Sequence, residues 1–457
     1  MVIKSFFIKT FGCQMNVSDS ERIAAILSEQ GMQLAAEVSK ADLIIVNGCT
    51  VRDKAVHKAV SALGELQDLK KGRAHGPFIG IGGCVGQFDK GNLFKRAPYL
   101  DFVFGTDAID SLPEIINRVV SGERHIALTE FDKSMDYSTE TKIYAKKAQA
   151  FVNIMKGCDK FCTYCVVPFT RGREKSRSIE EIVGDIGRLV SLGVKEVTLL
   201  GQNVNSYGKG QFPALLRAID TDPRCLSLRR IRFTSSHPLD FSEELIRCFN
   251  TPENGGVSRL ASHLHLPVQS GSDSVLRKMG RHHDIWSFIT KIDTLRSICP
   301  DVGLSTDIIV GFPSEAQEDF DATLALIDRV EFDNIFAFAY SARPGTKAAK
   351  MQDDVSEKTK KERLNTVLHR QLKIAGKRYA SRVGKVMEIL VEGAAKNQNL
   401  LNGPSPGVSV WTGRTSCNRV VNFPADHASK LGGSFVNVKI TGSTSLSLYG
   451  ELQGGLK

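Results

Sequence analysis

The chain has 457 residues, 42% of them hydrophobic and 24% charged, which excludes a disordered or collagen-like protein and leaves room for two to four domains of ~100–200 residues each. Sixty basic residues against fifty acidic ones give a formal net charge of +10, and this excess favours a polyanionic partner. No apolar run reaches the ~18 residues that span a membrane, and the N-terminus lacks the features of a signal peptide, so we expect a cytoplasmic protein with no membrane contact.

Residues 1–122 predict a small parallel α/β domain, because short apolar strands alternate with amphipathic helices. The expected strands are Phe6–Thr10, Leu43–Asn47, Phe78–Ile81 and Phe102–Phe104, and the expected helices are Asp19–Gln30, Val51–Lys71 and Ser111–Val120. The pattern Ser18-x-x-Glu21 is typical of a capping box and predicts where the first helix begins. The polar stretch 123–149 that follows is interpreted as a linker.

Residues 150–383 predict a central domain with six β/α repeats. Right-handed crossovers curl such a series into an open, partial (β/α)6 barrel, whose functional sites lie at the carboxyl ends of the strands. The pattern Ser178-x-x-Glu181 predicts the start of a helix over Ile179–Leu192. The expected strands are Phe151–Met155, Glu196–Leu200, Arg230–Thr234, His263–Val268, Leu304–Val310 and Asn334–Tyr340.

The end of the chain differs in character from the rest. Ser356–Arg382 predicts one long helix with nine Lys and Arg against two Glu, a net charge of +7. Residues 384–453 then predict a small all-β barrel, because short strands alternate with Gly and Pro. The expected strands of this barrel are Val386–Val391, Val408–Trp411, Arg419–Asn422 and Val436–Thr441.

Three cysteines lie within eight residues in the pattern Cys158-x3-Cys162-x2-Cys165. In a reducing compartment such thiols indicate metal ligands rather than disulfides. A structural zinc ion requires four ligands, and no fourth cysteine or histidine is close by in the sequence. A [4Fe–4S] cube takes one ligand per iron, so three thiolates leave one iron open to bind a substrate or cofactor. The spacing therefore favours an iron–sulfur cluster, with zinc as the alternative.

A second set of cysteines shares a context rather than a spacing. Cys13, Cys49 and Cys84 each follow an apolar strand and a glycine. The carboxyl ends of neighbouring parallel strands meet at one edge of a sheet, and glycine lets the backbone approach a bulky group closely. We therefore expect a second three-cysteine site at that edge; the alternative is three buried structural cysteines.

Two further features carry weaker predictions. His237 follows a strand and precedes a proline, a position that suits a cavity wall or a packed histidine equally well. Residues 170–177 hold four cationic side chains just beyond the cluster loop. They are interpreted either as a solvated loop or as a contact to phosphate groups.

These motifs resemble a known family. The pattern Cys158-x3-Cys162-x2-Cys165, with Tyr164 before the last cysteine, resembles the signature of radical S-adenosylmethionine (SAM) enzymes. Nearly the whole chain resembles the methylthiotransferases, which place a three-cysteine domain before the radical SAM domain and an all-β TRAM domain after it. Within that family, residues 10–16 and 157–172 look most like the MiaB branch.

The resemblance implies two [4Fe–4S] clusters, with Cys13, Cys49 and Cys84 as the ligands of one and Cys158, Cys162 and Cys165 as the ligands of the other. It also implies SAM as a cofactor, and no side chain is assigned a catalytic role, because the clusters and SAM carry the chemistry. Residues in stretches that end the second, fourth and fifth strands of the central domain are candidates to line the SAM site; they are Gln202, Asn203, Gln269, Ser270 and Gly311. Residues Gly413, Arg414, Thr415, Asn418 and Phe423 resemble the core motif of the TRAM domain.

The activity that the resemblance implies is methylthiolation of C2 of N6-isopentenyladenosine at position 37 of tRNA, by SAM methyl transfer and radical sulfur insertion. The expected partners are the tRNA anticodon stem-loop and a reducing electron donor protein, and a monomer is expected. The basic helix and the terminal barrel are expected to hold the tRNA backbone through Lys358, Lys360, Lys361 and Arg363. We expect Phe161, Val166, Val167 and Phe169 to receive the prenyl group.

Three alternatives remain at this point. The first is methylthiolation of N6-threonylcarbamoyladenosine 37, whose carboxylate would require a cation such as Arg171 or Arg173. The second is the related enzyme that modifies an aspartate of a ribosomal protein. The third is a non-enzymatic RNA-binding iron–sulfur sensor, which requires only one closed cluster.

Overall fold

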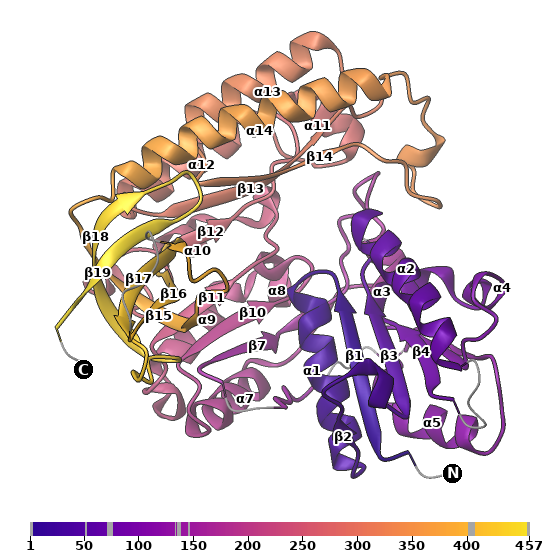
Figure 1. Ribbon diagram of the computed structural model, residues 1–457. Helices are drawn as coiled ribbons and strands as arrows, with labels where there is room; N and C mark the ends of the chain where they lie inside the picture. Colours follow the sequence, from indigo (N-terminus) through magenta and orange to yellow (C-terminus); the bar gives the residue numbers. More distant parts are fainter. Residues whose placement is uncertain are drawn as a thin grey trace.

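Three parts follow one another along the molecule in the computed structural model (Figure 1). The structure describes residues 3–50, 53–70, 76–132, 134, 139–144, 147–400 and 407–454. The N-terminal domain lies at one end, the central β/α domain in the middle and the C-terminal barrel at the other end. The predicted fold class is confirmed: an α/β domain, a partial barrel and a small all-β barrel.

The N-terminal domain is a parallel six-stranded sheet in the order β2-β1-β3-β4-β5-β6. Apolar side chains cover both faces of the sheet, with Ile23 and Ile115 among those on one face and Leu63 and Leu66 among those on the other. The strands are β1 Ser5–Phe11, β2 Gln33–Leu34, β3 Leu43–Gly48, β4 Phe78–Gly82, β5 Phe102–Phe104 and β6 Ile126–Leu128, and the helices are α1 Gln14–Glu29, α2 Asp53–Lys70, α3 Gly83–Asp89, α4 Asn92–Arg96 and α5 Leu112–Val120. Strand β6 lies within the stretch that was expected to be a linker.

The start of α1 corrects one prediction. The helix begins at Gln14 with Cys13 as its N-cap, so Ser18 and Glu21 lie inside it rather than at its start. The Asn16 side chain accepts a hydrogen bond from the Cys13 backbone N–H at 3.4 Å. Ser18 is instead buried and contacts Asn153 of the central domain. A capping-box pattern inside a helix is a coincidence of spacing that the sequence alone does not reveal.

The central domain holds two parallel three-stranded sheets, β7-β10-β11 and β12-β13-β14, which a bridge between Ile231 and Leu260 joins into one open barrel. The predicted capping box at Ser178 and Glu181 is confirmed. The strands are β7 Gln149–Asn153, β8 Met155–Lys156, β9 Lys175–Ser176, β10 Glu196–Leu200, β11 Arg230–Phe233, β12 His263–His265, β13 Gly303–Val310 and β14 Asn334–Ala339, and the helices are α6 Val167–Thr170, α7 Ile179–Ser191, α8 Tyr207–Gly210, α9 Phe212–Thr221, α10 Glu243–Arg247, α11 Asp273–Met279, α12 Ile285–Ile298, α13 Gln317–Val330 and α14 Glu357–Ala380.

The C-terminal domain is a closed barrel in the order β15-β16-β17-β19-β18. Its strands are β15 Val386–Ala394, β16 Val408–Thr415, β17 Val420–Asp426, β18 Phe435–Ser443 and β19 Leu448–Gln453. The sequence predicted the first four strands and missed β19, which closes the barrel between β17 and β18. The barrel core is apolar and continues onto Ala375 and Tyr379 of α14.

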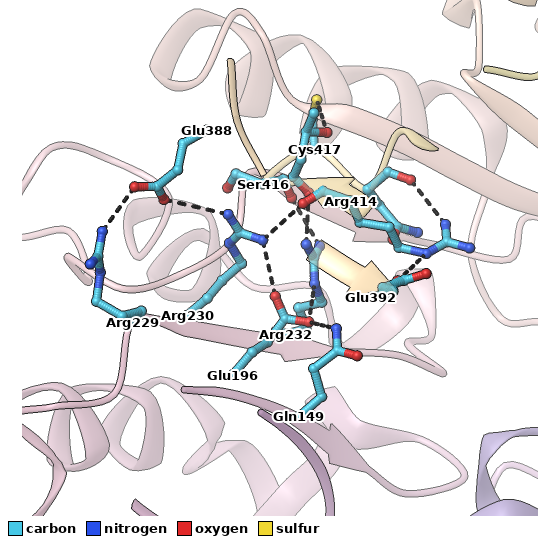
Figure 2. Close-up of polar contacts among 12 residues, drawn as sticks. Gln149, Glu196, Arg229, Arg230, Arg232, Glu388, Glu392, Arg414, Ser416 and Cys417 are labelled. Carbon is cyan, nitrogen blue, oxygen red and sulfur yellow. Dashed lines mark hydrogen bonds and ion pairs between the residues drawn. The ribbon is translucent and has the colours of Figure 1, made fainter. Parts of the chain in front are cut away.

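The C-terminal barrel docks onto the amino ends of the central strands, opposite the end where the cysteine loop lies. Arg232 of β11 donates hydrogen bonds to the backbone oxygens of Thr415 (2.7 Å), the last residue of β16, and Ser416 (2.9 Å), in the turn that follows (Figure 2). Glu196 of β10 pairs with both Arg230 (3.0 Å) and Arg232 (3.1 Å). These three side chains are buried, so the barrel is fixed to the central domain rather than tethered loosely. Of the helices that the structure describes, none is both long and apolar enough to cross a membrane.

Candidate functional site

The structure brings Cys13, Cys49 and Cys84 together. Strands β1, β3 and β4 end at one edge of the sheet, where Phe11 pairs with Gly48 and Asn47 with Gly82. Each cysteine comes just after one of these strand ends, and the thiol of Cys49 shares hydrogen bonds with those of Cys13 and Cys84. The predicted convergence is therefore present, and their role as cluster ligands stays a proposal.

Two glycines permit this close approach. Gly12 has φ +148°, and a Cβ added there would overlap the Cys49 side chain. Gly83 has φ +74°, and a Cβ there would overlap the Asn47 amide. Both positions therefore require glycine, for backbone conformation and for space. The buried Asn47 amide donates to the backbone oxygen of Asn16 at 2.8 Å and so ties β3 to α1 beneath the thiols.

The electrostatics at this edge favour thiolates. The hydrogen bond with Cys49 lowers the pKa of Cys13 to about 6 and that of Cys84 to about 7, and the nearby Arg171 guanidinium adds to both shifts. The same two hydrogen bonds raise the pKa of Cys49, which acts as the donor. Thiolates are the form in which cysteine binds metal, so two of the three thiols are already close to the ligating state at neutral pH.

The second set, Cys158, Cys162 and Cys165, lies on the loop after β8. The loop folds back on itself, because the Cys158 N–H donates to the Gly172 oxygen (3.2 Å) and the Cys165 N–H donates to the Cys162 oxygen (3.0 Å). Burial raises the pKa of Cys158 to about 11 and that of Cys165 to about 12. A metal ion would have to displace these thiol protons on binding.

The donor chemistry of both sets fits an iron–sulfur cube. Each set offers three thiols. Among the described residues, no three His, Cys, Asp or Glu side chains form a group that would hold a single metal ion. A single zinc ion requires four ligands that converge at ~2.0–2.3 Å, whereas a cube gives each thiolate an iron of its own. Three thiols in one neighbourhood therefore suit a cube better than zinc.

Each thiol set also has one buried arginine as a hydrogen-bond donor. The Arg171 Nε lies 3.3 Å from the Cys84 Sγ, and the Arg281 Nη1 lies 3.6 Å from the Cys162 Sγ. The sequence analysis missed both roles. Arg171 follows the cluster motif closely but was assigned to solvent or phosphate, and Arg281 is 119 residues from Cys162, so no local signal connects them.

The candidate SAM-lining residues fall into two groups. Gln202 and Asn203 follow β10 and reach the cluster loop, because Gln202 accepts the Gly157 N–H and Asn203 donates to Asp240 (2.7 Å), the ion-pair partner of Lys160. Their role as SAM contacts stays a proposal.

The other three candidates lie beyond β12 and β13. Gln269 is buried with φ +78°, and Ser270 is fully buried against Thr323 of α13. The Gly311 N–H donates to Glu315 at 2.6 Å. Hydrogen bonds engage Gln202, Asn203, Ser270 and Gly311 alike, so all five residues stay proposed SAM contacts.

His237 lies on the same rim and retains an unused nitrogen. Its Nδ1 accepts the Leu239 N–H at 3.1 Å, while its buried Nε2 has no hydrogen-bond partner among the described residues. Burial lowers the pKa of His237, with Arg281 adding to the shift, so the ring is neutral. The His283 ring packs against it at 5.9 Å. A neutral imidazole at this place is free to bind a polar group of a ligand.

The N-terminal and central domains meet through polar contacts. Arg171 pairs with Asp19 at 2.6 Å, Lys156 pairs with Asp107 at 3.1 Å, and the Thr106 hydroxyl donates to the Thr170 oxygen at 2.9 Å. A cavity of about 120 Å³ lies at this interface, with Asp19, Asp107, Lys156 and Arg171 among its lining residues. These contacts join the domains that carry the two cysteine sites.

The structure corrects the interpretation of the cationic loop 170–177. Arg171, Lys175 and Arg177 are buried, and Arg177 pairs with Asp185 at 3.1 Å. Only Arg173 is exposed, and it pairs with Asp159 at 2.6 Å. Three of the four cations therefore hold the fold together and do not reach an RNA phosphate.

The expected RNA contacts on α14 are partly wrong for the same reason. Lys360 is buried and paired with Asp353 (2.7 Å) and Glu357 (2.8 Å). Arg363 is buried and paired with Glu315 at 2.6 Å. Lys358 and Lys361 are exposed, so only these two of the four cations stay candidates for a phosphate contact.

The apolar side chains expected around the cluster loop differ in exposure. Phe161 is 46% exposed and Phe169 is 48% exposed, whereas Val166 is buried and Val167 half-buried. Phe161 adopts φ +49°, and the Arg173 guanidinium lies 5.2 Å from its ring centroid. The two phenylalanines are thus the accessible apolar surface beside the cysteines.

In a comparison with known proteins, each of the three domains matches a protein family. Residues 5–105 match the uncharacterized protein family UPF0004, residues 152–327 match the Radical SAM superfamily, and residues 380–453 match the TRAM domain. The cysteine loop of the central domain and these matches define a radical SAM enzyme with a TRAM domain, and the class implies an iron–sulfur cluster and SAM as cofactors. The exact domain limits of 122, 149 and 383 stay predictions.

Curated relatives narrow the class to a family. The chain is 42% identical to the tRNA-2-methylthio-N(6)-dimethylallyladenosine synthase of Bdellovibrio bacteriovorus, over 98% of this chain and 95% of that one. It is 44% identical to the proteins of the same name from Geobacter metallireducens and Francisella philomiragia, over 98% of this chain and 98% and 99% of theirs. The chain belongs to the MiaB-like methylthiotransferase family.

Solved structures support the fold alone. The radical S-adenosylmethionine methyltransferase TsrM from Kitasatospora setae, with cobalamin and a [4Fe-4S] cluster bound, aligns with a TM-score of 0.56 at 13% identity, over 76% of this chain and 77% of that one. The cobalamin-dependent S-adenosylmethionine radical enzyme OxsB aligns with a TM-score of 0.52 at 12% identity, over 81% of this chain and 56% of that one.

Proposed function

We propose that this protein methylthiolates C2 of N6-isopentenyladenosine at position 37 of tRNA, giving 2-methylthio-N6-isopentenyladenosine. The observation that carries the proposal is the near full-length similarity to synthases named for this product. The two separate three-thiol sites support it, because sulfur insertion into an unactivated aromatic C–H requires cofactor chemistry that no acid or base supplies.

We further propose two [4Fe–4S] clusters, one on Cys158, Cys162 and Cys165 and one on Cys13, Cys49 and Cys84. When bound, the first would cleave SAM reductively and the second would hold the sulfur that is transferred. The chain's own part is to orient these groups and to exclude water. The proposed contacts to SAM are Gln202, Asn203, Gln269, Ser270 and Gly311, and a reducing protein is the proposed electron donor.

The target adenine must leave the anticodon stack, because C2 is out of reach inside it. Phe161 and Phe169 offer the accessible apolar surface that a five-carbon prenyl group requires. Burial at ~0.8 kcal/mol per CH2-sized group would contribute several kcal/mol. A threonylcarbamoyl carboxylate would instead require a cation, but Arg171 is buried against Asp19 and Arg173 is paired with Asp159. This charge distribution favours the prenylated base.

The test presents reduced, reconstituted protein and SAM with three anticodon stem-loops that differ only at adenosine 37: unmodified, prenylated or threonylcarbamoylated. Nucleoside mass spectrometry should find the methylthio product on the prenylated stem-loop at least tenfold above the other two. Preference for the threonylcarbamoyl substrate would assign the protein to the related branch of the family. SAM cleavage with no modified nucleoside would point to the aspartate-modifying branch, and no SAM cleavage at all would favour an RNA-binding sensor.

A further inference from the structure

Arg171 is the residue through which the central domain touches the thiols of the N-terminal domain. Its Nη2 donates to Asp19 of α1 at 2.6 Å, and its Nε donates to the Cys84 Sγ at 3.3 Å. Both side chains of the ion pair are only 6% exposed. One planar guanidinium therefore serves a carboxylate and a cysteine sulfur at once, which an ammonium group cannot match in geometry.

The backbone of Arg171 is anchored to the other cysteine site. Its N–H donates to the Val167 oxygen at 2.8 Å, and the preceding carbonyl, that of Thr170, accepts the Thr106 hydroxyl. Arg171 follows Cys165 by six residues. The same short segment thus carries the last thiol of one set and a hydrogen-bond donor to a thiol of the other.

We propose that Arg171 is a positioning residue that raises the reduction potential of the cluster held by Cys13, Cys49 and Cys84, while Asp19 opposes it. This inference rests on the proposed function, because it requires that second cluster. Hydrogen bonds to cluster sulfurs and nearby net charge are among the factors that set such potentials. A cation next to a ligand sulfur stabilises the reduced, more negative state, and burial strengthens the effect because the local dielectric is low.

The alternative is that Arg171 and Asp19 form an ordinary buried ion pair that only joins two domains. The two interpretations predict different shifts in the reduction potential of the second cluster. Under the proposal, removal of the cation lowers the potential, whereas removal of the neighbouring anion raises it. A purely structural pair would lose stability in both cases without opposite shifts in potential.

The chain offers a matched control in Arg177. It lies six residues further along the same segment, is buried, and pairs with Asp185 at 3.1 Å. Its side chain donates hydrogen bonds to the Asn153 and Glu181 backbone oxygens and to Asp185, none of them a cysteine. Its replacement breaks a comparable buried ion pair and leaves the thiols untouched.

The experiment is a redox titration, followed by electron paramagnetic resonance, of the full-length protein after anaerobic reconstitution. The cluster whose signal changes on addition of SAM is assigned to Cys158, Cys162 and Cys165, and the other cluster is the one of interest. The variants are Arg171→Gln, Arg171→Lys, Asp19→Asn and Arg177→Gln. Iron content and the thermal unfolding midpoint of each variant establish that the clusters and the fold persist.

We expect a lower potential of the second cluster in Arg171→Gln, a higher one in Asp19→Asn, partial recovery in Arg171→Lys and no shift in Arg177→Gln. Shifts of the same sign in Arg171→Gln and Asp19→Asn, or an unchanged potential, would overturn the inference and leave the two-cluster proposal intact. Should Arg171→Gln fail to fold, two other measurements test the inference: the sign of the potential shift in Asp19→Asn and the size of the potential shift in Arg171→Lys. A wild-type protein with only one cluster would overturn the two-cluster proposal and this inference together.

Discussion

The ion pairs of α14 show which of its cations are free to meet RNA. Lys360 and Arg363 are buried in ion pairs, while Lys358 and Lys361 face solvent. Arg363 is 8% exposed and its partner Glu315 is fully buried. Neighbouring residues of α14 therefore have different roles. A substitution of the exposed lysines should change tRNA binding, and a substitution of the buried arginine should change stability.

We predict that Lys358→Gln and Lys361→Gln together weaken tRNA binding and flatten its salt dependence. Each lost phosphate contact should reduce the slope of log affinity against log salt by about 0.7–0.9. Fluorescence anisotropy at several salt concentrations measures this slope, and the unfolding midpoint should not move. An unchanged slope would mean that this face of α14 only meets solvent.

Arg363→Gln should lower the stability of the protein and leave tRNA binding unchanged. Breaking a buried ion pair costs about 3–5 kcal/mol, because Glu315 is left as an uncompensated buried charge. We expect a clear fall in the denaturation midpoint with a tRNA salt slope like that of the wild type. A stability equal to that of Lys361→Gln would contradict the burial of this pair.

The sequence could not distinguish these cations. The cysteine positions followed from strand ends and a local motif, both of which the sequence displays. Each of the pairs Arg171–Asp19, Arg281–Cys162 and Arg363–Glu315 joins residues 48 to 152 positions apart in the sequence. Local pattern predicts a cluster loop well, but it does not predict which guanidinium the fold encloses.

At the scale of elements, the turn between β16 and β17 is the joint between the C-terminal barrel and the central domain. Ser416 accepts from Arg232 through its backbone oxygen and from the Ser262 N–H through its hydroxyl at 2.9 Å. Gly303 begins β13 beneath this turn, where an added Cβ would overlap the Cys417 oxygen. The turn therefore packs directly against the starts of the central strands, as Figure 2 shows for Arg232.

We predict that Arg232→Gln loosens this joint. The buried Thr415 oxygen and the half-buried Ser416 oxygen lose their donor, at a cost of about 1–3 kcal/mol for the buried group. Hydrogen exchange should rise in the turn at residues 416–419 and in neighbouring strand ends. Arg229→Gln is the matched control, because Arg229 is 54% exposed and pairs with Glu388, which is 46% exposed, a surface contact worth about 0–1 kcal/mol. Equal exchange in both variants would show that the barrel is held by other contacts.

Part of this architecture was visible in the sequence and part was not. The alternation of strand and helix predicted the order of the domains, and β-rich runs predicted most of the C-terminal barrel. Strand β19 was missed because its sequence, Leu448–Gln453, holds a glycine and a glutamate, and its place depends on pairing with both β17 and β18. The docking of the barrel on Arg230 and Arg232 depends on tertiary contacts that no local pattern encodes.

At the scale of the whole molecule, Arg171 of the central domain contacts Cys84 across the interface with the N-terminal domain, while the C-terminal barrel occupies the far end of the central domain (Figure 1). The contacts from Asp19, Thr106 and Asp107 to the central domain fix the distance between the two sites. The proposed function uses this arrangement, because it assigns SAM cleavage to one site and sulfur transfer to the other.

This division leads to the last prediction, in which each site is removed by itself. Reconstituted wild-type protein should carry roughly eight irons, at four per cube. Replacement of Cys13, Cys49 and Cys84 by Ala should leave about half of the iron and preserve reductive cleavage of SAM to 5′-deoxyadenosine, but abolish the methylthio product. Replacement of Cys158, Cys162 and Cys165 by Ala should also leave about half of the iron, yet abolish SAM cleavage. Iron analysis and chromatography of the SAM products distinguish the two variants, and a methylthio product from the first, or SAM cleavage by the second, would contradict the two-site arrangement.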